Sequence, residues 1–316
     1  MIPFSFELYP PRSAESERAL PATIDALALA GPEFFSVTYG ANGSSRDSSL
    51  SVLRYLLQNT QVKPMAHLTC VGSSHAEANQ LIRQFLDAGI DSFLALRGDP
   101  PLGSDDETAL GDLGSAGELV QLIHRVQAER VPYTEVPLPG LAGAARVDTH
   151  RTKVTVAVAA FPNGHPRSRS TSQDVDVLLA KEAAGADLAI TQLFFDADDY
   201  LRFVERARRA GVTMPILPGI MPVTSPAKLR RIAELAGEPV PPALMARLEA
   251  APTAHERFRV GVDSAVDLTT TVVEGGAPGI HLYTFNRHEA VLAVLRESGI
   301  VHDEPEESVS RAKELA

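Results

Sequence analysis

A repeated helix ending is the feature that most constrains how this chain can fold. An Ala-Gly pair closes a segment with helical spacing, and a short apolar run follows it, at four places: Ala30-Gly31, Ala88-Gly89, Ala184-Gly185 and Ala210-Gly211. Glycine readily adopts the left-handed conformation that ends a helix, and tight connections from a helix to a strand favour it. Because each return leads from a helix straight into a strand, the pattern predicts parallel strands joined by helices.

Eight short apolar runs are expected to be these strands: 4–9, 34–39, 65–70, 93–97, 154–161, 188–194, 216–220 and 280–285. Most of them are apolar throughout, which is typical of strands covered on both faces. Their usual separation approximates the ~30 residues of a strand–helix–strand unit. Eight such units in 316 residues predict an α/β fold of the (β/α)8 TIM barrel type. An open, doubly wound sheet is the alternative, and the absence of a Gly-x-Gly-x-x-Gly motif after a strand counts against its dinucleotide-binding form.

Two segments fall outside this pattern. Residues 131–151 are too rich in proline to be helical, and we expect an inserted loop or hairpin there. The barrel is expected to cover residues 1–301. The acidic segment 302–316 is expected to be a weakly structured tail.

The charge of the chain limits its partners. The formal net charge is −11, which argues against a surface for nucleic acid or for an anionic membrane, since either needs a basic face. No apolar run approaches the ~20 residues of a membrane span. The single cysteine, Cys70, excludes an intramolecular disulfide and a cysteine-based zinc site, and its apolar surroundings in sequence favour a buried, inert thiol. We therefore expect a soluble, cytoplasmic protein.

The stretch from Ser92 to Pro101 indicates where chemistry is expected. An apolar run too short for a helix ends at Arg97, Gly98 and Asp99, and two prolines prevent its continuation. In a TIM barrel the active site lies at the carboxyl ends of the strands, so polar residues at those ends are expected to meet. They are Glu7, Thr38, Tyr39, His67, Arg97, Asp99, His165, Gln192, Tyr283, Asn286 and Arg287. Polar groups around the mouth of an apolar barrel predict a ligand site.

Two carboxylates in this set predict acid–base chemistry. Glu7 is flanked in sequence by Phe6 and Leu8, and such surroundings are expected to raise its pKa so that it can donate a proton. Asp99, close to Arg97, is expected to stay ionised and to stabilise a developing cation. The alternatives are structural: Glu7 could serve a salt bridge or a helix cap, and Asp99 could serve a turn.

Three further residues have both a functional and a structural interpretation. His67 and His165 are expected to be hydrogen-bonded structural groups, because as a zinc pair they lack a third ligand. Gln192 lies in a strand that is expected to be buried on both faces. An amide is costly there unless it is hydrogen-bonded, so Gln192 is more informative than an amide at the surface.

Seven motifs, in this order, resemble the methylenetetrahydrofolate reductase family: Phe4–Arg12, Val37–Gly43, His67–Cys70, Leu96–Asp99, Ile190–Asp196, Pro218–Pro222 and Tyr283–Arg287. The resemblance implies the bacterial catalytic barrel and the reduction of 5,10-methylenetetrahydrofolate to 5-methyltetrahydrofolate with NADH or NADPH. Family members commonly form homo-oligomers. The alternatives are a related one-carbon enzyme with the same barrel and a barrel that binds folate without turnover.

The resemblance also implies roles for individual residues. Glu7 matches the general acid that assists opening of the imidazolidine ring of the folate, and Asp99 matches the carboxylate that stabilises the resulting 5-iminium cation. Gln192 matches an amide that binds folate. Tyr283 and Arg287 are expected to contact the folate with it.

The cofactor that the resemblance implies is FAD. Positions matching the family's FAD contacts are Thr38, His67, Arg97, Gly98, Asp99, His165, Asp174 and Lys181. Four other contact positions are changed: Ser115 and Phe161 stand where tyrosines are usual, and Val177 and Ala180 replace an asparagine and an arginine. Each lost hydrogen bond weakens binding by about 1 kcal/mol. Two routes for the hydride therefore stay open, one through FAD and one directly from NADH to the folate.

Overall fold

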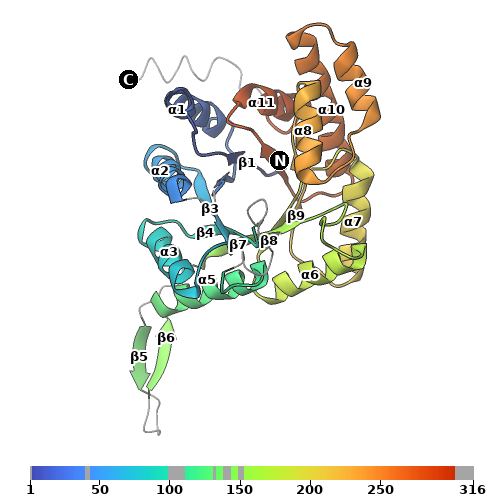
Figure 1. Ribbon diagram of the computed structural model, residues 1–316. Coiled ribbons are helices and arrows are strands. Elements are labelled where there is room, and N and C mark those ends of the chain that lie inside the picture. The colour runs from blue at the N-terminus through green and yellow to red at the C-terminus, as the bar shows by residue number, and fades with distance from the viewer. Residues whose placement is uncertain are drawn as a thin grey trace.

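Parallel strands close into a barrel at the centre of the molecule (Figure 1). The computed structural model describes residues 2–39, 43–98, 111–130, 133–137, 144–148 and 153–302. The barrel strands are β1 (Phe4–Leu8), β2 (Phe34–Val37), β3 (Lys63–Thr69), β4 (Ser92–Leu96), β7 (Thr155–Ala160), β8 (Leu188–Thr191), β9 (Ile216–Leu217), β10 (Gly219–Ile220) and β11 (Ile280–Tyr283). Neighbours pair in parallel, in the order β10-β11-β1-β2-β3-β4-β7-β8-β9.

Pro218 divides one strand position of the barrel between β9 and β10. Before it, Leu217 pairs with Ile190 of β8, and after it, Gly219 pairs with His281 of β11. A proline has no backbone N–H to donate to a neighbouring strand, so the interruption falls at this residue. β9 and β10 together join the two ends of the sheet. The predicted TIM barrel is thereby confirmed.

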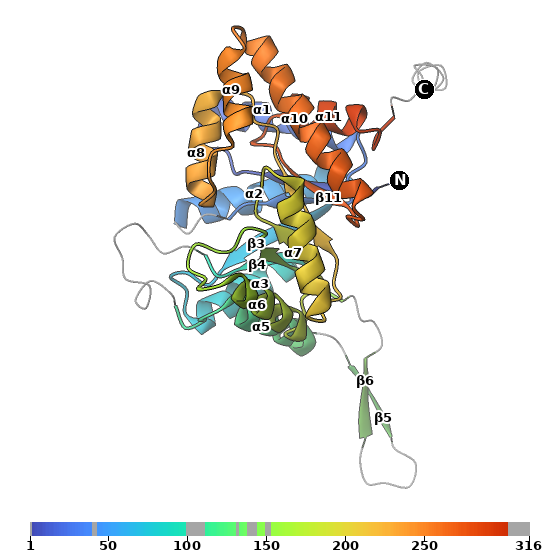
Figure 2. The same cartoon turned by 90° about the vertical axis from the view of Figure 1, so that its right-hand side faces the viewer.

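Helices surround the barrel (Figures 1 and 2). They are α1 (Ala14–Ala28), α2 (Gly43–Asn59), α3 (His75–Asp87), α5 (Ala116–Arg130), α6 (Thr171–Ala183), α7 (Ala197–Arg209), α8 (Pro226–Ala236), α9 (Pro242–Ala250), α10 (Ala254–Glu274) and α11 (His288–Glu297). The glycines expected to end helices all have left-handed φ angles, with 74° at Gly31, 85° at Gly89, 109° at Gly185 and 100° at Gly211. These predicted helix endings are therefore confirmed.

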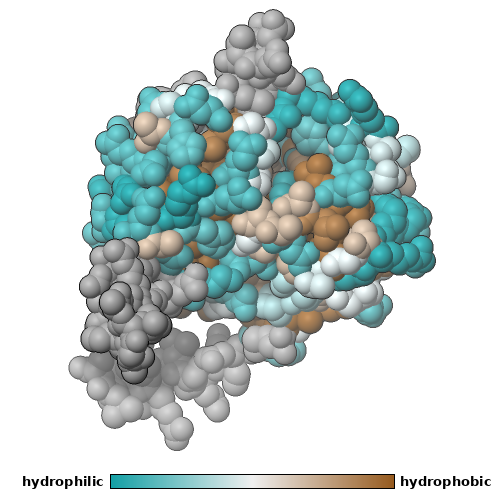
Figure 3. Space-filling model, turned by 90° about the horizontal axis from the view of Figure 1, so that it is seen from below, coloured by the Kyte–Doolittle hydropathy of each residue, from teal (hydrophilic) through white to brown (hydrophobic). Residues whose placement is uncertain are grey.

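Side chains of the strands alternate between two apolar layers. Outward-facing residues such as Phe6, Phe35 and Phe93 pack with helix residues in the main core. A separate cluster centres on the inward-facing residues Phe34, Met65, Leu94, Ala157 and Ile190. Seen from below, the described surface is largely hydrophilic, and hydrophobic residues show at several places between the hydrophilic ones (Figure 3). The apolar runs of the sequence thus supply side chains mainly to these two layers.

An antiparallel hairpin lies between α5 and β7. Its strands are β5 (Tyr133–Pro137) and β6 (Ala144–Asp148), and Figures 1 and 2 both show it projecting from the barrel. It falls within residues 131–151, where an insertion is expected, whereas residues 303–316 of the expected tail lie outside the described residues. No helix in the described part of the chain has the length and apolar character that crossing a bilayer requires.

Candidate active site

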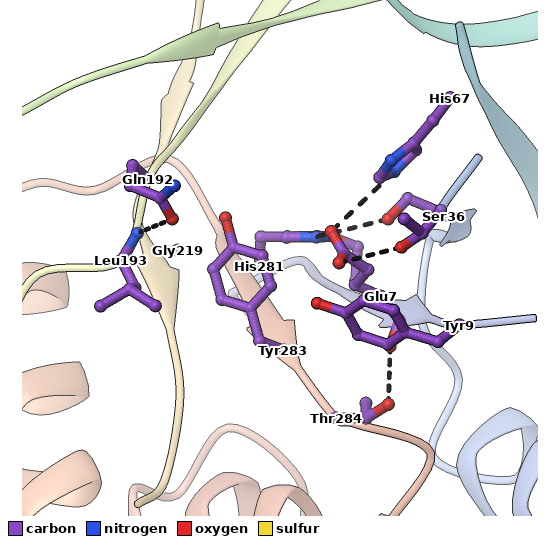
Figure 4. A network of polar contacts seen from close by, with 12 residues as sticks. Glu7, Tyr9, Ser36, His67, Gln192, Leu193, Gly219, His281, Tyr283 and Thr284 are labelled. Carbon is purple, nitrogen blue, oxygen red and sulfur yellow. Dashed lines mark hydrogen bonds and ion pairs between the residues drawn. The ribbon is translucent and has the colours of Figure 1, made fainter. Parts of the chain in front are cut away.

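Polar side chains line one side of the barrel interior (Figure 4). In β1, the residues on either side of Glu7 belong to the outer core, so Glu7 points inward. Its carboxylate approaches His67 of β3, and Ser36 of β2 approaches His281 of β11. These strands are not neighbours in the sheet, so the contacts run across the inside of the closed barrel.

Glu7 is the centre of this polar group. Its carboxylate is buried, and the Thr38 hydroxyl donates a hydrogen bond to Oε1 at 3.2 Å. Nε2 of His67 and Nε2 of His281 each lie 3.9 Å from Oε2. The carboxylate is therefore held between a hydroxyl from β2's carboxyl end and imidazoles from β3 and β11.

The predicted pKa of Glu7 was wrong. Burial alone would raise it, but the neighbouring side chains of His281, His67 and Tyr9 outweigh burial, so the pKa of Glu7 lies below its ordinary value. The prediction relied on Phe6 and Leu8, whose side chains point to the opposite face of the strand. Because the Glu7 carboxyl is ionised at neutral pH, it must receive a proton before it can act as an acid.

The two histidines have different surroundings. His281 is fully buried, with Nδ1 2.7 Å from Ser5 Oγ and its ring stacked on Phe34 at a centroid distance of 5.9 Å. Nε2 of His67 makes no hydrogen bond within the described chain, and burial lowers the pKa of His67 to about 4. Sequence reasoning missed His281 and Ser5. The available signal was a histidine two residues before Tyr283, which places both on the same face of a strand.

A strained corner after β11 fixes the end of β1. The Thr284 hydroxyl donates to the carbonyl of Glu7 at 2.6 Å, and the Asn286 amide bonds both the N–H and the carbonyl of Tyr9 at 2.8 Å. Phe285 and Asn286 have left-handed φ angles of 49° and 56°, which no other non-glycine residue of the described chain has. Phe285 also stacks on Tyr9 at 5.1 Å. Backbone strain of this kind costs about 1–3 kcal/mol per residue and persists only where contacts enforce it.

We expect Asn286→Ala to lower the free energy of unfolding by about 2 kcal/mol. The change removes two hydrogen bonds to the backbone of Tyr9, and alanine tolerates a left-handed backbone less well than asparagine. Urea unfolding followed by circular dichroism measures the difference. The control is Asn163→Ala, which removes one exposed contact with Glu238 and should cost less than about 0.5 kcal/mol. An equally small loss for Asn286→Ala would contradict this interpretation of the corner.

The residues expected to bind folate lie at three different places around the mouth. Oε1 of Gln192 accepts the next backbone N–H at 2.9 Å. The Tyr283 hydroxyl donates to the carbonyl of Thr191 at 2.8 Å and so joins β11 to the end of β8. Figure 4 shows Tyr283 between Gln192 and Glu7. Arg287 is exposed and occupies the N-cap position of α11.

The flavin-related residues near α6 are engaged within the chain. Oδ1 of Asp174 accepts the His165 N–H at 3.1 Å and the Ser168 hydroxyl at 2.6 Å, whereas Oδ2 is buried without a hydrogen-bond partner. Nζ of Lys181 donates to the carbonyl of Ala159 at 2.8 Å, and burial lowers the pKa of Lys181 to about 8. Oδ2 of Asp174 therefore still lacks a hydrogen-bond partner among the described residues.

The other flavin-related residues lie after β2, in β3 and after β4. Gly98 has a left-handed φ of 82°, and a Cβ there would lie 2.8 Å from Cγ2 of Val71, so the position requires glycine. Arg97 precedes it and is half-buried, whereas Asp99 lies outside the described residues. Thr38 and His67 both face Glu7.

The described residues do not supply a complete set of FAD contacts. The ring of Phe161 packs edge-on against His165 at 4.7 Å and has no hydroxyl to offer. Val177 is 44% exposed on α6 and has no polar atom in its side chain. Asp174 has one oxygen occupied by its own loop. The described side chains at positions 161 and 177 therefore do not fit the FAD contacts that the resemblance implies.

Cys70 has a structural environment. Its thiol is buried and lies 3.4 Å from the carbonyls of Leu96 and Ser115. Burial raises the pKa of Cys70 to about 12, so little thiolate forms at neutral pH. In the described parts of the chain no three metal-ligating side chains come together as a metal site.

Comparisons with known proteins agree over nearly the whole chain. Residues 1–299 match the sequence profile of the family described as methylenetetrahydrofolate reductase. The 5,10-methylenetetrahydrofolate reductase of Salmonella typhimurium is 33% identical over 300 residues, which cover 95% of this chain and 91% of the relative. A probable methylenetetrahydrofolate reductase (NADH) of Oryza sativa is 30% identical over 301 residues, or 95% of this chain and 48% of the plant protein. The chain thus spans about half of that relative.

A solved structure shares the fold. An uncharacterised protein from Clostridium thermocellum that binds two copies of 5-methyl-5,6,7,8-tetrahydrofolic acid superposes with a TM-score of 0.57. The two chains are 14% identical, and the match covers 94% of this chain and 93% of the other. At this identity the likeness extends to the barrel alone.

The fold and the site define a (β/α)8 barrel enzyme with a carboxylate and two imidazoles inside the barrel. The chain belongs to the methylenetetrahydrofolate reductase family. It is an oxidoreductase that acts on methylenetetrahydrofolate.

Proposed function

We propose that this chain reduces 5,10-methylenetetrahydrofolate to 5-methyltetrahydrofolate with hydride taken directly from NADH, and that Glu7 supplies the proton. The observation that carries the proposal is the inward-facing carboxylate of Glu7 between His67 and His281. A carboxyl group held in this way inside a barrel can deliver a proton to a ligand nitrogen at the mouth.

The chemistry needs one hydride and one proton. Protonation of N10 by Glu7 lets the C–N bond to the bridging carbon break, which leaves a 5-iminium cation. Hydride from NADH then adds to that carbon and forms the methyl group, while NADH becomes NAD⁺. The nitrogen keeps the proton, so each turnover takes up one proton from Glu7, and Glu7 must be protonated again.

Other residues have supporting roles in this proposal. Asp99 stabilises the iminium cation, and Gln192 and Arg287 hold the folate. Tyr283 contributes its ring to the wall of the pocket, because its hydroxyl is already bonded to the carbonyl of Thr191.

The direct route is supported by the incomplete set of FAD contacts. The lost hydroxyl at Phe161 and the apolar side chain of Val177 remove polar partners from the positions that the family uses. Relatives whose names specify NADH support this nucleotide as the hydride donor. Hydride transfer without an intermediate carrier requires NADH and folate to be bound together.

Deuterium transfer tests the route. With NADH deuterated at the transferred position of C4, we expect each methyl group of the product to carry one deuterium. Purified protein should be colourless, initial rates should show a sequential pattern, and added FAD should leave the rate unchanged within about twofold.

Three results would contradict parts of this proposal. Yellow protein with ping-pong kinetics would exclude the direct route, and so would deuterium lost to water during turnover. Failure of the colourless protein to oxidise NADH in the presence of methylenetetrahydrofolate would contradict the reductase function itself. NADPH in place of NADH serves as the matched comparison for nucleotide preference.

A further inference from the structure

An exposed aromatic ring lies at the mouth of the barrel, on the corner that follows β11. Phe285 is 48% exposed, and no other phenylalanine or tyrosine whose side chain the structure describes is exposed. Its ring stacks on Tyr9 at a centroid distance of 5.1 Å, with the two ring planes 9° apart. A single exposed apolar side chain is common in proteins, but this one is also held in a fixed orientation.

The backbone conformation at Phe285 is unfavourable for a phenylalanine. Its φ of 49° lies in the left-handed region, where bulky side chains are rare. The neighbours Thr284 and Asn286 fix the corner through hydrogen bonds to the backbone of the β1 end. Glycine would adopt this conformation without strain, yet the chain has a large ring here. Strain of this kind is concentrated at ligand sites, so the ring is a candidate for contact with the substrate.

Tyr9 connects the exposed ring to the carboxylate inside the barrel. Figure 4 shows the side chain of Tyr9 beside Glu7. Burial and the nearby charge of Glu7 both raise the pKa of Tyr9, which agrees with this closeness. From the carboxylate outward, the ring of Tyr9 comes first and the ring of Phe285 follows.

Two positively charged side chains lie beyond the exposed ring. Arg287 is exposed at the N-cap of α11, two residues after Phe285. Partial burial and the charge of Arg287 lower the pKa of Lys228, which lies in the first turn of α8. The two positive groups are therefore near each other, and together they suit a ligand with two carboxylates.

We propose that the exposed ring of Phe285 binds the aminobenzoyl ring of the folate by stacking. This inference rests on the proposed function, because it takes Glu7 as the acid that protonates N10. In a folate, N10 carries the aminobenzoyl ring, and the far side of that ring carries a glutamate with two carboxylates. The protein presents Glu7 for the nitrogen and Phe285 for the ring. Arg287 and Lys228 follow for the carboxylates, so the order of groups is the same in both molecules.

Aromatic rings in contact prefer offset-stacked or edge-to-face arrangements, and both leave a flat face in use. Because Tyr9 already holds the ring of Phe285, little conformational freedom of this side chain is lost when the folate binds. Phe285 is therefore a substrate-binding residue that selects for the aromatic part of the folate.

The variant Phe285→Gly separates binding from stability. Relief of the left-handed strain offsets the lost contact with Tyr9, so the midpoint of urea unfolding should stay within about 0.3 M of that of the unaltered protein. The dissociation constant of 5-methyltetrahydrofolate should rise about tenfold. That of 5-methyltetrahydropterin, which lacks the aminobenzoyl ring, should change less than about twofold. KM for the folate should rise about tenfold with kcat changed less than about threefold, because the contact is the same before and during the reaction.

Phe285→Tyr and Leu29→Ala are the controls. Tyrosine keeps the ring, so affinity for 5-methyltetrahydrofolate should return to within about threefold of the original. Leu29 is exposed at the C-cap of α1, and its loss should change that affinity less than about twofold. Unchanged affinity in Phe285→Gly would overturn the inference, and so would equal losses for the folate and the pterin. A loss that Phe285→Tyr does not restore would overturn it as well.

A fragment of the folate covers the case in which Phe285→Gly fails to fold. Aminobenzoylglutamate carries the ring and the carboxylates without the pterin, and its binding to the unaltered protein needs neither NADH nor turnover. Ring currents from Phe285 should shift its aromatic proton resonances upfield when it binds. A saturated complex without that shift would overturn the inference.

Failure of this inference can be distinguished from failure of the proposed function. If the fragment and the folate bind as expected but NADH is not oxidised, the proposed function fails, and the place of the aminobenzoyl ring stands. If turnover is normal and Phe285→Gly binds the folate as tightly as the unaltered protein, this inference alone fails.

Discussion

Replacing Glu7 by glutamine should lower kcat about a thousandfold while the folate still binds. A general acid typically contributes a factor of about 10² to 10⁴, and glutamine cannot donate a proton to the departing nitrogen. Its amide oxygen can still accept the hydrogen bond from Thr38, so the shape of the site is kept. NADH oxidation at saturating folate measures kcat, and equilibrium binding of 5-methyltetrahydrofolate measures affinity, which should change less than about threefold.

The control for this change is Glu17→Gln. Glu17 lies exposed in α1, and removing its charge should leave kcat within about twofold. If Glu7→Gln retains more than about a tenth of the original turnover, Glu7 is not the acid. A parallel loss of folate binding would instead indicate that the carboxylate holds the substrate.

Replacing Gly219 by alanine should lower the free energy of unfolding by about 3 kcal/mol. A Cβ at this position would lie 2.4 Å from the carbonyl oxygen of Thr191 and 2.7 Å from the ring of Tyr283. The hydrogen bond from Tyr283 to Thr191 would have to break, at about 1–3 kcal/mol, in addition to the strain of overpacking. The cost arises where β10 and β11 close the barrel.

Gly117→Ala is the matched control for Gly219→Ala. Gly117 lies in α5, where the nearest neighbours of an added Cβ are 3.8 Å and 3.9 Å away. Alanine should leave the stability unchanged or raise it by up to about 1 kcal/mol. It lowers the conformational entropy of the unfolded chain and favours the helical conformation more than glycine does. Urea unfolding of both variants gives the comparison. If both variants are equally stable, the junction of β10 and β11 can relax around a methyl group, and the predicted cost at Gly219 is wrong.

Local pattern in the sequence was enough to predict the barrel. Glycines such as Gly31 and Gly185 end helices through their own φ angles, and the apolar runs mark strands through their immediate neighbours. Both signals depend on contacts within a few residues along the chain. The division of one strand position at Pro218 also had a local cause, because proline lacks an N–H, although the pattern alone did not indicate it.

The surroundings of Glu7 could not be predicted in the same way. Sequence neighbours suggested an apolar setting and a raised pKa, whereas the folded chain surrounds the carboxylate with Thr38, His67 and His281 and lowers its pKa. The partnership of Ser5 with His281 joins residues 276 positions apart. No periodicity in either segment indicates that partner.

The sequence by itself determined the eight strand positions, the residues at their carboxyl ends and the family to which they correspond. Tertiary structure alone decided which of those side chains meet and in which protonation state they are held. The physical reason is that strand identity depends on neighbours along the chain, whereas the charge of a buried group depends on everything within a few ångströms of it. Closure of the barrel brings β1 beside β11, and that closure places His281 against Glu7.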